Sequence, residues 1–239
     1  MRRFALRMAL ALLFLFALST KFVDINICAG FGRHPAEIAW AATGLDAERF
    51  TLDYWAAVQA GTARVDPREM VRKAASRLGI REPAVFAGQT GGIRFANLDG
   101  VAVEGGEAVL TLQAGERETA LGISLVFDRL PPDILRLERR IRLAVSGIAP
   151  RGGICWAIRG RRPGRLRDES WRAMWARVLG ALEGARRGET RGDDLIEAYS
   201  PLLRGTGENG INLVLLRRYE PDRRTTLVVV ASPNLAEAD

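Results

Sequence analysis

The fold is decided by residues 54–79, which read YWAAVQAGTARVDPREMVRKAASRLG, and by their counterpart at 155–180, which reads CWAIRGRRPGRLRDESWRAMWARVLG. The two stretches align without a gap at an offset of 101 residues, so that Trp55 matches Trp156 and Gly79 matches Gly180. Self-similarity at a fixed spacing is typical of an internal repeat. We therefore expect two structural halves, with Trp55 and Trp156 in equivalent positions.

Each copy predicts a short strand followed by an amphipathic helix. In the first copy, Asp66 is placed to cap a helix that begins with Pro67 and carries apolar residues at helical spacing. In the second copy Asp168 is the expected cap. The expected buried stripe of this second helix is Trp171, Met174, Trp175, Val178, Leu179 and Leu182.

The remaining segments complete both halves. Strands before the two helices are expected at 54–60 and 153–161, and strands after them at 84–88, 93–103, 107–114, 118–127, 195–199, 211–219 and 225–231. An amphipathic helix after Pro131 and Pro132 links the halves, and residues 34–44 predict a short N-terminal helix.

This order predicts an α+β fold made of a duplicated strand-helix-strands unit, with a mostly antiparallel sheet and helices on one side, because each helical stripe needs an apolar sheet face. The expected divisions are a leader at 1–30, a first half at 31–130, the linking helix at 131–150, a second half at 151–235 and a tail at 236–239.

The first thirty residues predict export. Arg2, Arg3 and Arg7 precede an apolar run at 8–18, which is short for a membrane span and typical of a signal peptide. An uncleaved membrane anchor remains the alternative. The net charge is +7, but Lys21 and Lys73 are the only lysines among 35 basic residues, a bias that weakens any inference of nucleic-acid binding from charge.

The duplicated pattern, the segment YWAAVQAG and the ending NLVLLRRYEPDRRTTLVVVASP resemble the YwmB-like family of exported proteins from spore-forming bacteria of Gram-positive lineage. The resemblance spans residues 45–235 and is sharpest in the last thirty. It implies a fold similar to the saddle of the TATA-box-binding protein and implies no activity. The arginine-rich segment RGRRPGRLR departs from the family's pattern.

That segment, residues 159–167, is the best candidate for contact with an anion. Five arginines surround an expected Pro-Gly turn, and guanidinium groups bind phosphates and carboxylates bidentately. Strand alternation places some of them on the helix-free face of the sheet, together with residues of 211–219. The candidate contact residues are Arg159, Arg161, Arg162, Arg165, Asn212 and Arg218, and replacing Arg161, Arg162 and Arg165 with glutamine is expected to weaken anion binding. A solvated loop is the alternative.

Other motifs predict no chemistry. The GTGENG motif at 205–210 precedes a strand, whereas a dinucleotide loop opens a helix, so a turn is expected. His34 is the only histidine and has no partner at ligand spacing, so we expect neither a metal site nor a histidine-dependent triad. The acidic pairs Asp193-Asp194 and Glu116/Glu118 are expected in solvated turns. No catalytic residue and no cofactor is therefore expected.

These observations favour an exported, non-catalytic binding module of the cell envelope, whose partner is an anionic polymer or another envelope protein. An uncleaved leader would add contact with the membrane. A nucleic-acid-binding protein is one alternative, but export disfavours it, and a minor-groove saddle needs paired phenylalanines on the open sheet face. Phe86, Phe95 and Phe127 do not fall at matching places in the two halves. A carboxylate-dependent envelope hydrolase is the other alternative.

Overall fold

The computed structural model describes residues 33–58, 66–115, 119–149, 152–186, 194–203 and 210–232. From Pro35 onward these residues form an α+β fold within one compact unit. Its α-helices are α2 (Pro35–Thr43), α3 (Pro67–Leu78), α4 (Ile134–Val145) and α5 (Asp168–Ala181). Its strands are β1 (Arg49–Ala57), β2 (Arg81–Thr90), β3 (Ile93–Val101), β4 (Glu107–Ala114), β5 (Thr119–Phe127), β6 (Gly152–Pro163), β7 (Ala185–Arg186), β8 (Leu195–Tyr199), β9 (Leu213–Glu220) and β10 (Thr225–Ser232).

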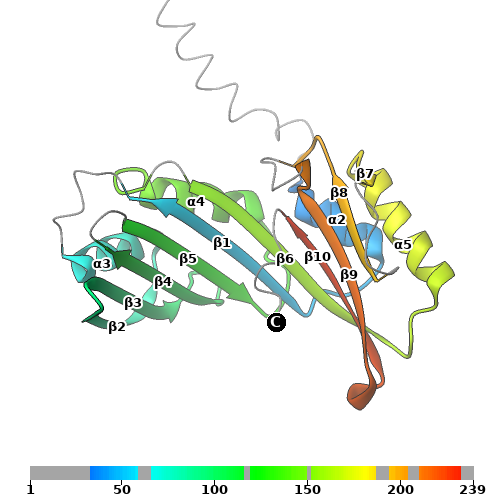
Figure 1. Ribbon diagram of the computed structural model, residues 1–239, viewed down its shortest axis with the longest axis horizontal. Coiled ribbons are helices and arrows are strands. Elements are labelled where there is room, and N and C mark those ends of the chain that lie inside the picture. Colours follow the sequence, from blue (N-terminus) through cyan, green and yellow to red (C-terminus); the bar gives the residue numbers. More distant parts are fainter. Residues whose placement is uncertain are drawn as a thin grey trace, which may run out of the picture. The chain divides into compact units, whose positions relative to one another are not determined.

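The strands form one ten-stranded sheet in the order β2-β3-β4-β5-β1-β6-β10-β9-β8-β7, and every pair in it is antiparallel. From the middle of the sheet, the strands follow in one direction as β1, β5, β4, β3 and β2, and in the other direction as β6, β10, β9, β8 and β7. Each half therefore places its own first strand in the middle, followed by its fifth, fourth, third and second strands. The two halves of the chain thus contribute sheet halves of the same topology (Figure 1).

The gapless alignment of the two halves at an offset of 101 residues, however, does not agree with the pairing of β1 and β6. Leu52 lies opposite Trp156 in the β1–β6 pair, whereas Trp55 lies opposite Gly153. Successive strand residues alternate between the two faces of the sheet, so an alignment of the halves at an odd offset, such as 101 residues, matches residues that lie on opposite faces. Trp156 is therefore buried at 4% exposure and Trp55 is 48% exposed on the other face, so the predicted equivalence of the two tryptophans is wrong.

The helices lie on one face of the sheet, where the core is. Helix α3 packs on β2, β3 and β4 and against α4, while α2 packs against α5 and contacts β6 and β10. The strand residues on this face alternate with those of the open face and are mostly apolar and buried, as in Phe50, Leu52 and Tyr54 of β1. The predicted antiparallel sheet with helices on one side is confirmed at this level. The opposite face of the sheet is free of helices among the described residues.

Local signals fix most helix ends. The Asp66 side chain caps α3 by accepting a hydrogen bond from the Arg68 backbone N–H at 3.0 Å, as expected. Gly79 ends the helix with φ 73°, a left-handed conformation that glycine adopts without a Cβ clash. The cap predicted for α5 is wrong: Arg167 is at the cap position, and Asp168 is the first helical residue.

Several predictions fall outside the described residues. They are the leader at 1–30, the tail at 236–239, residues 205–209 of the glycine motif, Asp193, and the pair Glu116/Glu118. Within the residues that are described, no helix is both long enough and apolar enough to cross a membrane.

Candidate anion-binding face

An arginine cluster lies on the helix-free face where the two sheet halves meet. Arg49 of β1 lies directly opposite Arg159 of β6. On the other side of β6, Arg161 lies opposite Leu227 of β10, which in turn lies opposite Arg218 of β9. Residues directly opposite one another in neighbouring strands share a face. We call Arg49, Arg159, Arg161 and Arg218 the arginine cluster.

Arg159 is the centre of this cluster. Burial lowers the pKa of its guanidinium group, and the positive charges of Arg49, Arg218 and Arg161 lower it further. Its Nε atom is buried without a hydrogen-bond partner among the residues that the structure describes. A desolvated cation surrounded by like charges is unfavourable until an anion reaches it. This local geometry therefore favours an incoming phosphate or carboxylate.

Arg161 differs from its neighbours because two carboxylates already bind it. Its Nε atom donates a hydrogen bond to Glu220 at 2.9 Å, and its Nη1 atom donates to Glu48. The hydrogen bond with Glu220 raises the pKa of Arg161, and the same contact lowers the pKa of Glu220. Arg161 therefore organises the edge of the cluster, while no ion pair among the described residues neutralises Arg49, Arg159 or Arg218.

The structure places the predicted contact residues unequally. Arg159, Arg161 and Arg218 come together as expected on the open face. Arg162 and Arg165 are exposed but do not belong to the cluster, because this arginine-rich segment forms the end of β6 and the connection to α5. Gly164, with φ 74°, turns the chain there.

Asn212 does not face a ligand. Its side chain is fully buried: its Oδ1 atom accepts from the Ser200 N–H at 2.7 Å, and its Nδ2 atom donates to the backbone oxygens of Ser200 and Leu203. It therefore stabilises the segment after β8, and its assignment as a contact residue is wrong. An asparagine at the start of a strand predicts such backbone bonding as readily as an exposed site.

Sequence reasoning missed Arg49 and the two carboxylates that bind Arg161. Arg49 lies outside the strand that was expected at 54–60, since β1 begins five residues earlier. Pairing of β1 with β6 brings Arg49 to Arg159 across a long sequence separation. The alternation through Phe50, Leu52 and Tyr54 could have extended the predicted strand to Arg49.

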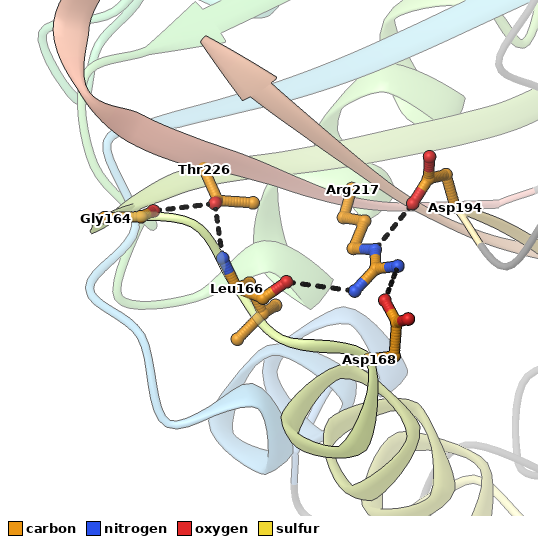
Figure 2. A network of polar contacts seen from close by, with 6 residues as sticks. All are labelled: Gly164, Leu166, Asp168, Asp194, Arg217 and Thr226. Atoms are coloured by element: carbon orange, nitrogen blue, oxygen red, sulfur yellow. Dashed lines mark hydrogen bonds and ion pairs between the residues drawn. The ribbon is translucent and has the colours of Figure 1, made fainter. Parts of the chain in front are cut away.

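A second polar network holds α5 on the helix-covered side, as Figure 2 shows. Arg217 of β9 donates to Asp194 at 2.6 Å, to Asp168 at 2.5 Å and to the Leu166 backbone oxygen at 3.0 Å. Burial lowers the pKa of Arg217, but the hydrogen bonds with Asp168 and Asp194 outweigh it, so that the pKa is raised. This network accounts for Asp168, the residue that the sequence suggested as a cap.

Thr226 of β10 binds the other end of the segment that connects β6 to α5. Its hydroxyl donates to the Gly164 backbone oxygen at 2.8 Å and accepts from the Leu166 N–H at 2.9 Å (Figure 2). The chain between β6 and α5 is thus bound to β9 and β10 through side chains on both. Arg165 belongs to this connection, whose backbone is held in place by Arg217 and Thr226. Its exposed position therefore follows from the fold and does not require a ligand.

In the described part of the chain, two carboxylates converge on one arginine in two places. Glu48 and Glu220 meet at Arg161, and Asp168 and Asp194 meet at Arg217. A hydrolase acid needs a raised pKa, whereas the arginine contacts lower the pKa of Glu220 and of Asp168. Glu220 and Asp168 are therefore poorly suited to act as the acid of a carboxylate mechanism. Among the described residues, no group of three or more His, Cys, Asp and Glu side chains could hold a metal ion.

The open face of the first half is aromatic. Phe86 of β2 is 66% exposed, and its ring lies 5.8 Å from that of Phe95 in β3. Trp55 covers Gly122 of the neighbouring strand so closely that a Cβ there would meet the indole ring at 2.7 Å. A phenylalanine pair is therefore present on this face, while Phe127 is buried on the helix side.

Fold and site define a class: an α+β protein whose described residues form one antiparallel sheet, covered by helices on one face and carrying aromatic and arginine side chains on the other. The scan against protein-family models and the search of curated proteins give no match.

Two solved structures with weak similarity are the regulatory subunit of aspartate kinase from Thermus thermophilus and the di-domain ARO/CYC StfQ from the steffimycin biosynthetic pathway. The first is 10% identical, with 81% of this chain and 89% of that chain covered, at a TM-score of 0.22. The second is 9% identical, with coverages of 75% and 83%, at a TM-score of 0.17. Scores this low bear on neither the fold nor the function of this chain.

The two arginine networks predict a loss of stability in acid. The folded-state pKa values of Glu220 and Asp168 are lowered from 4.5 and 3.8, so the pairs stabilise the fold above these values and lose that contribution as pH falls through the lower folded-state values. We expect the unfolding free energy, measured with urea, to fall below about pH 4.5. The double variant Arg161→Gln, Arg217→Gln should show a shallower fall; an unchanged profile would contradict the assignment.

Proposed function

We propose that this protein is an exported, non-catalytic binding module of the bacterial cell envelope, and that the helix-free sheet face is its binding surface. The observation that carries the proposal is Arg159, a partly desolvated guanidinium group beside Arg49 and Arg218, whose Nε atom has no hydrogen-bond partner among the described residues. Arginine clusters bind phosphate and carboxylate groups through charge-assisted hydrogen bonds. The partner is an anionic envelope polymer.

The proposed fold is a saddle similar to that of the TATA-box-binding protein. Two supports are the strand order, which repeats outward from β1 and β6, and the placement of the described α-helices on one face. The sequence resemblance to YwmB-like proteins is the third support. In this arrangement β1 and β6 form the middle of the open face, so the arginine cluster lies at the junction of the two halves.

Nucleic acid is the second candidate partner, and a specific observation favours it. Phe86 is exposed on the open face and its ring packs against the half-buried ring of Phe95. Exposed aromatic wedges enter base steps in minor-groove complexes. The described part of the outer strands in the second half, β7 and β8, offers no phenylalanine pair. The wedge is thus one-sided, and fold similarity does not establish the function.

Retention on immobilised polymers separates these candidates. The purified protein is applied to poly(glycerol phosphate), polyglutamate, duplex DNA and uncharged dextran at about 50 mM and 200 mM salt, since counterion release makes such binding strongly salt-dependent. We expect retention on poly(glycerol phosphate) at the lower salt and its loss at the higher. Retention on DNA alone that is lost in Phe86→Ser would favour the second candidate, and equal elution from all four carriers would contradict both.

Export needs a separate test, because binding to a polymer in vitro does not show in which compartment the protein is located. Fractionation of the native organism should place the protein outside the cytoplasm, as residues 1–30 predict. Intact protein in the soluble cytoplasmic fraction would contradict this part of the proposal.

A further inference from the structure

Strand β2 forms a long free edge of the sheet. Among the described residues it pairs only with β3, and the opposite edge, β7, is two residues long there. Proteins commonly protect edge strands with charges, prolines or bulges, because unpaired backbone groups attract other strands. In β2 these devices are confined to the start, where Pro83 lies within a bulge between Arg81 and Ala84.

The rest of β2 lacks such protection. The segment Ala84–Thr90 reads AVFAGQT, carries no charged residue and pairs regularly with β3. In an edge strand, about half of the residues direct both backbone N–H and C=O away from the neighbouring strand. This segment can therefore accept one more strand through main-chain hydrogen bonds.

A groove beside β2 adds side-chain selectivity. It has a volume of about 500 Å³ and lies between α3 and the strand edge. Ile80, Val85 and Leu98 provide an apolar floor, while Arg72 and Ser76 line it from the helix. A strand added to β2 would direct alternate side chains toward this groove, because strand side chains alternate between faces.

The other side chains of an added strand would lie on the open face, next to the exposed ring of Phe86. Both sides of such a strand would therefore meet apolar surface, and Arg72 supplies a positive charge at the groove. A second copy of β2 is a poor match, because Ala84–Thr90 contains no carboxylate to pair with Arg72.

The geometry points to a peptide-binding site at the β2 edge: an extended segment of another protein adds to β2 as a further strand, places an apolar side chain in the groove beside α3 and pairs a carboxylate with Arg72. Main-chain hydrogen bonds supply affinity in this mode of recognition, and the groove supplies specificity. The site is distinct from the arginine cluster and does not depend on the function proposed for it.

The probe is a short synthetic peptide of alternating valine and threonine that ends in aspartate. Titration into the full-length protein is followed by NMR of the backbone amides and by calorimetry. We expect a Kd below about 1 mM, with protection of Ala84–Thr90 amides from hydrogen exchange. Arg72→Glu should weaken binding about five- to tenfold, because it replaces attraction with repulsion.

The matched control is Lys73→Glu, which makes the same charge change at an exposed neighbour that does not line the groove. It should bind the peptide almost as wild type does. A peptide with alternate backbone nitrogens methylated to block the edge hydrogen bonds should not bind. No binding at millimolar peptide, equal binding of the methylated peptide, or self-association through β2 that excludes the peptide would each overturn the proposal.

Discussion

Replacing Trp171 with alanine is expected to lower the unfolding free energy by about 3–5 kcal/mol, the typical cost of removing a large aromatic side chain from a core. The indole is completely buried and lies with Met174, Val178 and Leu179 on the buried face of α5. The Arg217 guanidinium also lies 5.7 Å from the ring centroid, so a cation–π contact is lost with it. Urea unfolding followed by circular dichroism measures the difference.

Trp175→Ala is the control, because Trp175 is on the same helix, one turn further on, and only partly buried. It should cost about 1 kcal/mol, the centre of the distribution for single substitutions. Equal losses for the two variants would contradict the orientation of α5.

Replacing Arg49, Arg159 and Arg218 together with glutamine is expected to weaken binding to a phosphate polymer by about 100-fold or more. Each charge-assisted hydrogen bond contributes about 1.5–3 kcal/mol, and 1.4 kcal/mol corresponds to a factor of ten. The slope of log K against log salt should also fall in magnitude by about 2 for three contacts on a flexible polyanion. Calorimetric or fluorescence titration at several salt concentrations gives both quantities.

The matched control replaces Arg162, Arg165 and Arg167 with glutamine. It removes the same net charge from exposed positions outside the cluster, so a general charge effect would weaken both variants equally. The cluster variant should be at least as stable as wild type, because it relieves the repulsion around Arg159. Equal binding losses in the two variants would place the anion away from the open face. The choice of Arg49, Arg159 and Arg218 revises the sequence-based expectation that replacing Arg161, Arg162 and Arg165 weakens anion binding.

Local patterns predicted the elements well, and the reason is physical. The spacing of apolar residues in α4, with Ile134, Leu137, Ile141 and Val145 all buried, reflects burial of one helical face. The strands β4 and β8 have the predicted bounds, because alternation and turn residues define a half-buried strand. The Asp66 cap follows from a side chain that bonds to its own backbone neighbours.

The register between the halves could not be obtained in the same way. The identities at Trp55 and Gly79 favoured an offset of 101, but burial in the helices follows an offset of 104, which matches Met70 with Met174 and Ala75 with Leu179. Matching letters do not report which side of a strand or helix a residue occupies. A test of face parity would have rejected the odd offset in β1 and β6.

The site was predictable in part, for a related reason. Alternation within β6 was enough to place Arg159 and Arg161 on the open face. Arg49 and Glu48 reach the cluster only through pairing of β1 with β6, a long-range contact that local patterns do not encode. Asn212 was misassigned because its bonds to Ser200 and Leu203 depend on the path of the preceding segment.

The central claim, that the open face binds an anion at Arg159, is tested most directly by NMR of the arginine Nε–H groups during titration with a short polyphosphate. The account predicts that the Arg159 signal shifts most, because a buried Nε atom gains its missing partner, and that Arg49 and Arg218 shift with it. Shifts confined to Arg162, Arg165 and Arg167, with the Arg159 signal unchanged at saturation, would contradict it.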